Sequence, residues 1–422
     1  MAIKLTKEEI LKYHLGGKIE VSLLKRLSTD RDLSIAYTPG VAQVCREIMN
    51  QPDCIWDYTS KNNSVAVATD GTAVLGLGNI GAEASIPVME GKCVLFRTFA
   101  KINAWPICLN FRKNGRSDIE KFVEHLKAEA SLYGGINLED IAADECFEIE
   151  NRLDEELGIP VFHDDQWGTA VISLAAVINY CEVTDKKLDE IKIVINGAGA
   201  AGIRIADLYK DAGIKDIVLC DSKGVLSKFR NDLNFQKQRH SVNTNKKTLG
   251  EVIKGADVFV GVSVKGVLTK EMVQSMNKSP GIFAMANPDP EILPEEVKEV
   301  RKDAIVGTGR SDYPNQINNV LGFPFIFRGA LDVRADTINL KMKRAASRAL
   351  ADLAKKKVPE YVLKAYSLDR LEFGKDYLIP KPFDKRLLVE VPYAVAAAAI
   401  ETGVAKLKIN LDEYKKHLKK AR

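Results

Sequence analysis

The chain has 422 residues, more than one ordinary hydrophobic core holds, so two or three domains are expected. Hydrophobic residues make up 46% and charged residues 28% of the chain, which is the composition of a globular protein. A formal net charge of only +4 gives no reason to expect nucleic acid or an anionic membrane as a partner.

The seven cysteines form no CxxC pair, and this pattern indicates reduced thiols. The N-terminus has no apolar core of a signal peptide, and no segment approaches about 18 uninterrupted apolar residues. These features predict a soluble, cytoplasmic protein without a membrane segment.

The first predicted helix runs from Thr6 to Tyr13, and Glu9 stands where it completes a capping box with Thr6. The stretch Leu33 to Gly40 then shows no periodicity. Within it, Tyr37 directly precedes a prolyl turn, a setting in which a tyrosine is usually a packing residue.

A strand is predicted over Ser64 to Thr69, and the glycine-rich segment 75–81 follows it. Its glycines imply that the backbone comes close to either a ligand or another element, and the sequence leaves both open. The pattern next predicts that Pro87 to Lys92 forms the end of a helix. It also predicts strands over Cys93 to Phe99 and over Pro106 to Phe111.

Helical spacing over Asp118 to Tyr133 and over Cys146 to Leu157 predicts two helices beside two more strands. Each of these strands ends in a pair of adjacent acids: Glu139 and Asp140 in the first pair, Asp164 and Asp165 in the second. Acids at the carboxyl ends of strands can converge as hard oxygen ligands for Mg²⁺ or Mn²⁺. Acidic caps of the following helices are the alternative.

A charge-free helix over Gly168 to Tyr180 leads into a βαβ unit from Ile191 to Asp221. Its first turn is a GxGxxG motif made of Gly197, Ala198, Gly199, Ala200, Ala201 and Gly202. The three glycines permit, in order, a tight turn, the approach of a pyrophosphate, and close packing of helix on strand. This motif predicts binding of NAD or NADP, with the pyrophosphate at the helix N-terminus.

Asp221 ends the second strand of this unit, where an acid can accept hydrogen bonds from an adenosine ribose. The carboxylate favours NAD, whereas Lys223 and Lys228 could hold the 2′-phosphate of NADP. The sequence leaves the choice between the two cofactors open.

Further strands are predicted over Val258 to Val262, Ile282 to Ala286 and Ile305 to Val306, with helices between them. Strands alternating with helices predict an α/β fold with a doubly wound parallel sheet. Ligands of such a sheet lie beyond the carboxyl ends of its strands, near Ser263, Asn287 and Thr308 to Arg310. Asn287 precedes a proline, so a role in the turn is an equal alternative.

We expect three parts in the chain. Residues 1–165 form an α/β substrate and metal domain, residues 166–335 a Rossmann-type dinucleotide domain, and residues 336–422 a helical C-terminal extension.

Ten motifs occur in an order similar to that of the malic enzymes, specifically the short prokaryotic type. They are DLSIAYTPG, VATDGTAVLGLGNIG, PVMEGK, GINLEDI, FHDDQWGTA, INGAGAAGI, GVSVKGVLT, MANPDPEI, TGRSDYPNQINNVLGFP and FRGALD. This resemblance covers residues 32–332. It implies oxidative decarboxylation of (S)-malate to pyruvate and CO₂, reduction of NAD or NADP, dependence on Mg²⁺ or Mn²⁺, and at least a homodimer.

The resemblance also implies roles for particular residues. Tyr37 matches the general acid and Lys92 the general base of the family. Its three metal-binding carboxylates match Glu139, Asp140 and Asp165, and its substrate-contacting amides match Asn287 and Asn319.

Two positions depart from the family pattern. Ala73 stands where larger malic enzymes carry an arginine that holds a malate carboxylate, so another cation, with Arg97 and Arg310 as candidates, is expected to replace it. Trp167 stands where a small or polar residue is expected.

The implied chemistry requires Lys92 to be neutral when it takes the proton of the C2 hydroxyl, so its pKa is expected to lie well below its usual value. Tyr37 then protonates the enol at C3. The alternative enzyme is a malate or amino-acid dehydrogenase that does not decarboxylate its substrate. The alternative to an enzyme is a regulatory protein that binds a dinucleotide but has no catalytic activity.

Overall fold

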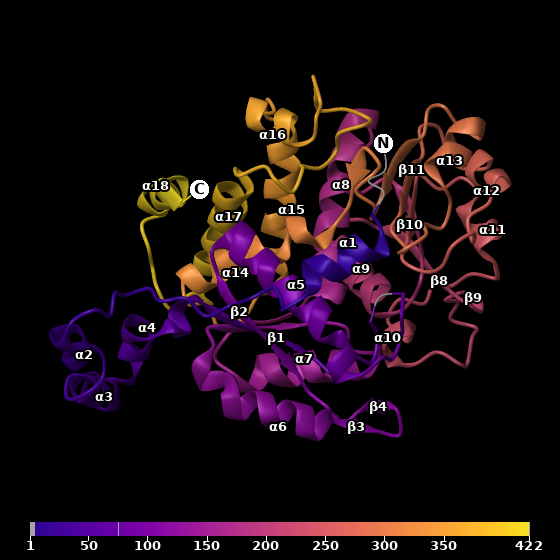
Figure 1. Ribbon diagram of the computed structural model, residues 1–422. Coiled ribbons are helices and arrows are strands. Elements are labelled where there is room, and N and C mark those ends of the chain that lie inside the picture. Colours follow the sequence, from indigo (N-terminus) through magenta and orange to yellow (C-terminus); the bar gives the residue numbers. More distant parts are fainter. Residues whose placement is uncertain (1–4, 75, 422) are drawn as a thin grey trace.

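The computed structural model describes residues 5–74 and 76–421, which form two mainly parallel sheets with their helices and a two-stranded antiparallel sheet of β3 (Arg112–Lys113) and β4 (Arg116–Ser117) (Figure 1). The smaller sheet has the order β2-β1-β5-β6, with β2 spanning Asn103–Cys108, β1 Ser64–Thr69, β5 Gly135–Leu138 and β6 Val161–His163. Helix α5 (Ala82–Ala100) packs on one face of this sheet, and α6 (Ile119–Glu129) and α7 (Glu145–Glu156) cover the other.

Helix α5 corrects the prediction that a helix closes near Lys92 and that Cys93 to Phe99 is a strand. The helix is continuous over both segments, with Pro87 in its second turn. Its buried positions include Met89, Cys93, Phe96 and Ala100, which recur at helical spacing. The apolar run over Cys93 to Phe99 is too short to distinguish a strand from a buried helix, and only the longer spacing of the buried residues indicates the helix.

The larger sheet confirms the predicted doubly wound α/β fold. Its order is β13-β12-β11-β10-β7-β8-β9, and all neighbours are parallel except the antiparallel pair β8-β9. The strands span Lys192–Asn196 (β7), Asp216–Asp221 (β8), Gly224–Val225 (β9), Val258–Gly261 (β10), Gly281–Ala284 (β11), Ile305–Thr308 (β12) and Asn315–Gln316 (β13). The order in which strands are added to the sheet reverses between β7 and β10, and sheets of this kind bind ligands at such a point.

Four helices pack together beside the two sheets: α8 (Thr169–Thr184), α14 (Phe323–Asp332), α15 (Leu340–Ala354) and α17 (Leu387–Glu401). They share one hydrophobic core with both sheets. Helix α15 packs against α8 and α17, and α17 packs against α14. The residues after 336 are therefore built into the body of the protein.

Helix α9 (Ala200–Asp211) is largely buried and packs against α8. Other helices lie nearer the surface of this body: α4 (Ile55–Tyr58), α10 (Phe235–Gln238), α11 (Leu249–Ile253), α12 (Lys270–Gln274), α13 (Pro294–Val300), α16 (Glu360–Ala365) and α18 (Leu411–Ala421). All seven cysteines are free thiols. Within the described residues, no helix has both the length and the apolar character needed to cross a bilayer.

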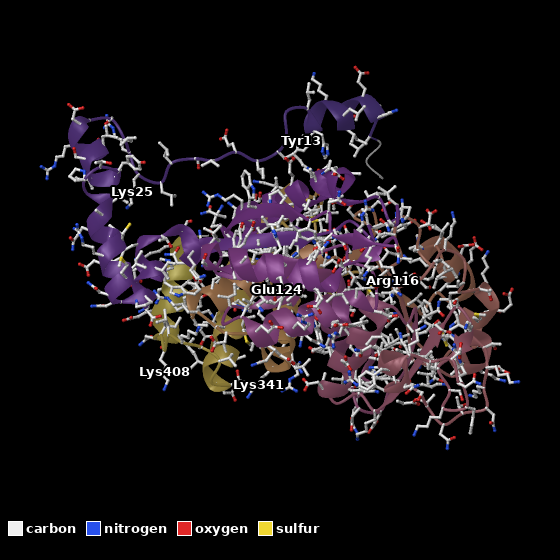
Figure 2. All side chains as sticks on the ribbon, turned by 90° about the horizontal axis from the view of Figure 1, so that it is seen from below. Tyr13, Lys25, Arg116, Glu124, Lys341 and Lys408 are labelled. Atoms are coloured by element: carbon white, nitrogen blue, oxygen red, sulfur yellow. The ribbon has the colours of Figure 1, made fainter. Side chains whose placement is uncertain are left out.

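Residues 5–50 are more exposed than the other described parts of the chain. Helices α1 (Lys7–His14), α2 (Asp30–Ala36) and α3 (Val41–Asn50) contain no buried residue. The predicted capping box of Thr6 and Glu9 is present in α1. Figures 1 and 2 show α2 and α3 projecting away from the body, joined to α1 by an extended segment.

Candidate active site

A buried cluster of charged residues lies beyond the carboxyl ends of β5 and β6. Lys92 reaches it from α5, and its Nζ lies 2.8 Å from Glu139 Oε1 and 2.6 Å from Asp164 Oδ2. The backbone N–H of Asp140 donates to Asp165 Oδ2 at 2.8 Å. Adjacent strands thus bring both predicted acid pairs to the same place, and we call these five residues the acid cluster.

The acid cluster has the composition of a site for a divalent cation. One carboxylate oxygen from each of Glu139, Asp140 and Asp165 lies within 4.8 Å of the other two. The cluster holds four carboxylates and one ammonium, that of Lys92, so negative charge is in excess, and Asp165 is its one residue that is not buried. Hard oxygen ligands in this arrangement fit Mg²⁺ or Mn²⁺.

The electrostatics of Lys92 differ from the expectation of a lowered pKa. Burial alone would lower the pKa of Lys92, but the ion pairs with Asp164 and Glu139 outweigh burial and raise that pKa. Burial also raises the pKa of Glu139 well above its usual value and that of Asp164 to about 6, although Lys92 acts against both shifts. In this state of the cluster Lys92 holds its proton.

Asn319, which precedes α14, lies in the same cluster, and its Nδ2 donates to Asp164 Oδ2 at 2.5 Å. Phe323, at the start of α14, places its ring 4.3 Å from Lys92 Nζ. The sequence pointed to Asn319 through the family resemblance, but the contacts of Asp164 and Phe323 with Lys92 were missed. The acid pair was the available signal for Asp164, and no local pattern marked Phe323.

A cavity of about 760 Å³ lies beyond the carboxyl ends of β7, β8 and β10. Gly197, Ala198 and Gly199 form part of its lining. Gly197 has φ +115°, and a Cβ there would come 2.4 Å from the carbonyl oxygen of Val262. At Gly202 a Cβ would strike the carbonyl oxygen of Gly197, whereas at Gly199 it would meet open space. The turn is therefore tight at Gly197 and Gly202 and accessible to a ligand at Gly199.

Asp221 lies at the edge of this cavity with two cationic partners. Its carboxylate accepts hydrogen bonds from Arg230 at 2.8 Å and from Lys237 at 2.9 Å. Burial acts to raise the pKa of Asp221, but these bonds outweigh burial and lower it, so the carboxylate stays ionised. Lys223 and Lys247 also line the cavity. The sequence pointed to Lys223, but it missed Arg230, Lys237 and Lys247.

Asn287 lies at the end of β11, where its side chain packs on Gly309 and its Nδ2 donates to the carbonyl oxygen of Met285 at 3.4 Å. The next residue, Pro288, approaches Gly76 of the glycine-rich segment, since a Cβ on Gly76 would lie 3.5 Å from Pro288 Cδ. In the same region a Cβ on Gly71 would come 2.2 Å from the carbonyl oxygen of Gly81. Close approach to other parts of the chain thus accounts for glycine at position 71.

Tyr37 is not among the residues that the fold brings to the acid cluster of its own chain. It follows α2, and 68% of its surface is exposed, whereas Lys92 is 7% exposed. Figure 1 shows α2 well apart from α5.

The two arginines considered as replacements at Ala73 have other partners. Arg97 donates to Asn103 Oδ1 at 3.1 Å, and Arg310 forms an ion pair with Asp312 at 2.7 Å. The structure places neither guanidinium in the acid cluster.

Trp167 directly follows the acid cluster in the chain and joins three parts of the protein. Its ring lies 4.7 Å from the Arg204 guanidinium of α9 and 3.7 Å from the Lys343 ammonium of α15. Arg204 also donates to Gln166 Oε1 at 2.9 Å. A small or polar residue at position 167 would leave both cations without this ring.

A cavity lined by the GxGxxG turn at the switch point of a doubly wound sheet, together with a cluster of carboxylates beyond the strands of the smaller sheet, defines the class of dinucleotide-dependent oxidoreductases with a candidate metal site. Comparisons with known proteins specify the family. Residues 16–154 match the malic enzyme N-terminal domain, and residues 167–366 match the malic enzyme NAD binding domain. The chain belongs to the malic enzyme family, which confirms the resemblance found in the sequence.

Individual relatives agree with this assignment. A probable NADP-dependent malic enzyme of Rickettsia prowazekii is 54% identical over 98% of this chain, which spans 54% of that relative. A bifunctional malic/malolactic enzyme of Bacillus subtilis is 51% identical over 96% of both chains. The crystal structure of a malic enzyme from Pyrococcus horikoshii superposes with a TM-score of 0.86 at 41% identity, covering 98% of this chain and 95% of that one. This chain thus spans about half the length of some relatives and nearly all of others.

Proposed function

We propose that this protein catalyses the oxidative decarboxylation of (S)-malate to pyruvate and CO₂, with reduction of NADP or NAD. The observation that carries the proposal is the position of Lys92 among Glu139, Asp164 and the other carboxylates of the acid cluster. It places a proton acceptor beside hard oxygen ligands in a dehydrated site. The two alternative enzymes do not require such a site. A malate dehydrogenase releases oxaloacetate without decarboxylating it, and an amino-acid dehydrogenase works without a metal.

Lys92 is the general base in this proposal. Its ammonium is held by Glu139 and Asp164, and a divalent cation held by Glu139, Asp140 and Asp165 would weaken this hold and lower the pKa of Lys92. In its neutral form the amine takes the proton of the C2 hydroxyl, while the hydride of C2 would pass to a bound nicotinamide. Bound Mg²⁺ or Mn²⁺ would supply Lewis-acid polarisation of the keto oxygen, held by Glu139, Asp140 and Asp165.

The remaining roles concern the enol that decarboxylation leaves. Tyr37 is the acid that protonates this enol at C3 to give pyruvate, while the amides of Asn319 and Asn287 orient the substrate. Asn319 supports this role because its amide already donates to Asp164 beside Lys92. Asn287 follows β11 of the dinucleotide domain and so can approach substrate from the cofactor side. In this proposal Asn287 also contacts the nicotinamide end of the cofactor.

We further propose NADP as the preferred cofactor. Around Asp221 and Asp232 stand four cations, Arg230, Lys237, Lys223 and Lys247, so positive charge is in excess at this end of the cavity. An excess of cations favours a 2′-phosphate over a free hydroxyl. The names of several relatives, including those from Rhizobium meliloti and Escherichia coli, also specify NADP. A homodimer or larger homo-oligomer acting in the cytoplasm completes the proposal.

The decisive experiment is a malate assay with NAD and NADP side by side, with and without Mn²⁺. We expect equimolar pyruvate, CO₂ and reduced cofactor, faster turnover with NADP, and no turnover after treatment with EDTA until Mn²⁺ or Mg²⁺ is restored. Oxaloacetate as the product would assign a simple malate dehydrogenase instead. Full activity in EDTA would remove the metal from the mechanism.

A further inference from the structure

Arg204 lies between the two sites that the proposed function joins. It belongs to α9, the helix that begins at Ala200 directly after the first two glycines of the GxGxxG turn, and it lies in the second turn of that helix. Arg204 is buried, although arginine is among the residues that are least often found inside a protein. It belongs neither to the acid cluster nor to the lining of the dinucleotide cavity, so the proposed function gives it no task.

The guanidinium of Arg204 contacts the segment between β6 and α8, residues 163–168, which we call the β6–α8 link. Its Nε donates to Gln166 Oε1 at 2.9 Å, and its central carbon lies 4.7 Å from the centre of the Trp167 ring. These two residues directly follow Asp165, one of the three carboxylates of the candidate metal site. Arg204 thus holds the link on the C-terminal side of that carboxylate.

Glu150 of α7 extends these contacts to the N-terminal side of Asp165. Arg204 Nη2 donates to Glu150 Oε2 at 3.2 Å, and Glu150 Oε1 accepts from the backbone N–H of His163 at 3.0 Å. All three residues are buried, where a charged hydrogen bond is stronger than in water and an unpaired polar group is costly. One side chain of α9 therefore holds the link on both sides of Asp165, on one side directly and on the other through Glu150.

The β6–α8 link has few other polar partners outside the acid cluster. Both ring nitrogens of His163 and Nε2 of Gln166 are buried and have no hydrogen-bond partner among the described residues. Of the polar side-chain atoms of these two residues, only Gln166 Oε1 has such a partner, and that partner is Arg204. Residues 164–168 also form a single turn of π-helix, a rare conformation that is frequent at functional sites. The position of the link therefore depends on Arg204.

We propose that Arg204 is a positioning residue through which the cofactor and the divalent cation strengthen each other's binding. The inference rests on the proposed function, which places the cation at Glu139, Asp140 and Asp165 and the pyrophosphate at the glycine turn. A pyrophosphate at the N-terminus of α9 orders the first turn of this helix, and Arg204 lies in the next turn. An ordered Arg204 holds the link in place, so less conformational entropy is lost when Asp165 becomes a ligand of the cation.

Binding titrations test this coupling without turnover. Equilibrium dialysis of the full chain measures the Kd of Mn²⁺ with and without saturating NADPH, at about 0.15 M salt, where exposed charges more than about 8 Å apart are largely screened. NADPH should tighten the binding of Mn²⁺ about tenfold, which lies within the usual range of coupling between two sites. Because such coupling is reciprocal, Mn²⁺ should tighten the binding of NADPH by the same factor in a fluorescence titration. Independent binding of the two ligands to the wild type would overturn the proposal.

Arg204→Lys separates positioning from charge, because lysine keeps a cation beside Glu150 but lacks the planar fork that also reaches Gln166. We expect this variant to lose the tightening of Mn²⁺ by NADPH, while its kcat at saturating Mn²⁺ stays close to that of the wild type. Gln166→Met removes only the acceptor and should lose the tightening in the same way, which keeps the test valid where Arg204→Lys does not fold. Arg344→Met is the matched control, since Arg344 binds Asp211 at the opposite end of α9 at 3.1 Å, and it should keep the full tightening.

The possible outcomes separate this inference from the proposed function. Full tightening by NADPH in both Arg204→Lys and Gln166→Met would overturn the coupling and leave the proposed function standing. Mn²⁺ binding that is weakened equally with and without NADPH would make Arg204 a structural support only, and it would overturn the coupling as well. A wild-type protein that binds no Mn²⁺ would contradict the metal site and therefore the proposed function itself.

Discussion

The acid cluster and the dinucleotide cavity both lie beyond the carboxyl ends of parallel strands, yet they are built in opposite ways. In the acid cluster Lys92, Glu139, Asp140 and Asp164 are all buried, and negative charge is in excess. In the cavity Asp221 is only partly buried, Lys223 and Lys247 are exposed, and positive charge is in excess.

This difference follows from the tasks of the two sites. Coulombic interactions grow as water is excluded, so each charge in the acid cluster strongly affects the protonation of its neighbours. The exposed ion pair of Lys223 with Asp232 is worth about 1 kcal/mol or less, and several cations of the cavity must act together to select a cofactor. Changes in the acid cluster should therefore alter the reaction, and single changes in the cavity should alter only the affinity for cofactor.

The largest effect is expected for Lys92→Ala. Loss of a general base lowers the rate of malate oxidation by about 10²–10⁴-fold, while cofactor affinity, measured by fluorescence titration with NADPH, should not change. Metal-dependent decarboxylation of added oxaloacetate should persist, because that step does not require the C2 hydroxyl proton. Lys113→Ala, on the exposed strand β3 (Arg112–Lys113), is the matched control and should behave as wild type. Equal loss of both reactions would contradict the assignment.

The second largest effect is expected where the two sites meet. Trp167 follows the turn of the acid cluster and contacts Arg204, which belongs to the same helix as Gly202. Trp167→Ala removes a buried ring and leaves two cations without it, so the free energy of unfolding should fall by about 3–5 kcal/mol. Urea denaturation measures this loss. Trp105→Ala, at an exposed ring on β2, is the control and should cost far less. Equal losses for the two variants would show that the junction does not depend on Trp167.

The dinucleotide domain could be predicted well because its signals are local. The strand, glycine turn, helix and Asp221 lie in one continuous stretch, and each part has its own pattern. The acid pairs after β5 and β6 were also visible, since the carboxyl ends of adjacent parallel strands meet at one edge. The prediction was wrong for α5, because the short apolar run over Cys93 to Phe99 resembles a strand and the helical periodicity is visible only over a longer stretch.

The contacts that set the chemistry of the acid cluster could not be predicted, because they join distant parts of the chain. Lys92 and Asp164 are separated by 72 positions, and Asn319 and Asp164 by 155. The sign of the pKa shift of Lys92 depends on these contacts. The stack of Arg204, Trp167 and Lys343 likewise joins three segments whose packing no local pattern encodes.

A smaller, pH-dependent effect is expected for Lys343, the buried cation on the other side of Trp167. Burial lowers its pKa from 10.5 to about 8. Between these values the unfolded chain binds the proton and the folded chain does not, so stability rises with pH in this window, by up to about 3 kcal/mol. Lys343→Met should lose this rise. The midpoint of urea denaturation, measured for the wild type and for Lys343→Met between pH 7 and 10, tests this difference. If the midpoints of the two proteins changed with pH in the same way, the lowered pKa of Lys343 would be contradicted.

The smallest effect is expected for Asp221→Ala, and it separates the two sites most cleanly. The substitution removes the group that can accept hydrogen bonds from the ribose, so the KM for NAD should rise roughly tenfold, the value of one charged hydrogen bond. It also releases Arg230 and Lys237 from their ion pairs with Asp221, and these cations can then meet a 2′-phosphate. NADP should therefore be affected less than NAD, and the ratio of the two kcat/KM values should move towards NADP. The KM for malate should stay constant because Asp221 lies in the cavity and not in the acid cluster. Asp216→Ala, at the exposed start of the same strand β8, is the control and should change none of these values. An effect confined to the KM for malate would mean that the cofactor does not bind with its ribose at the end of β8.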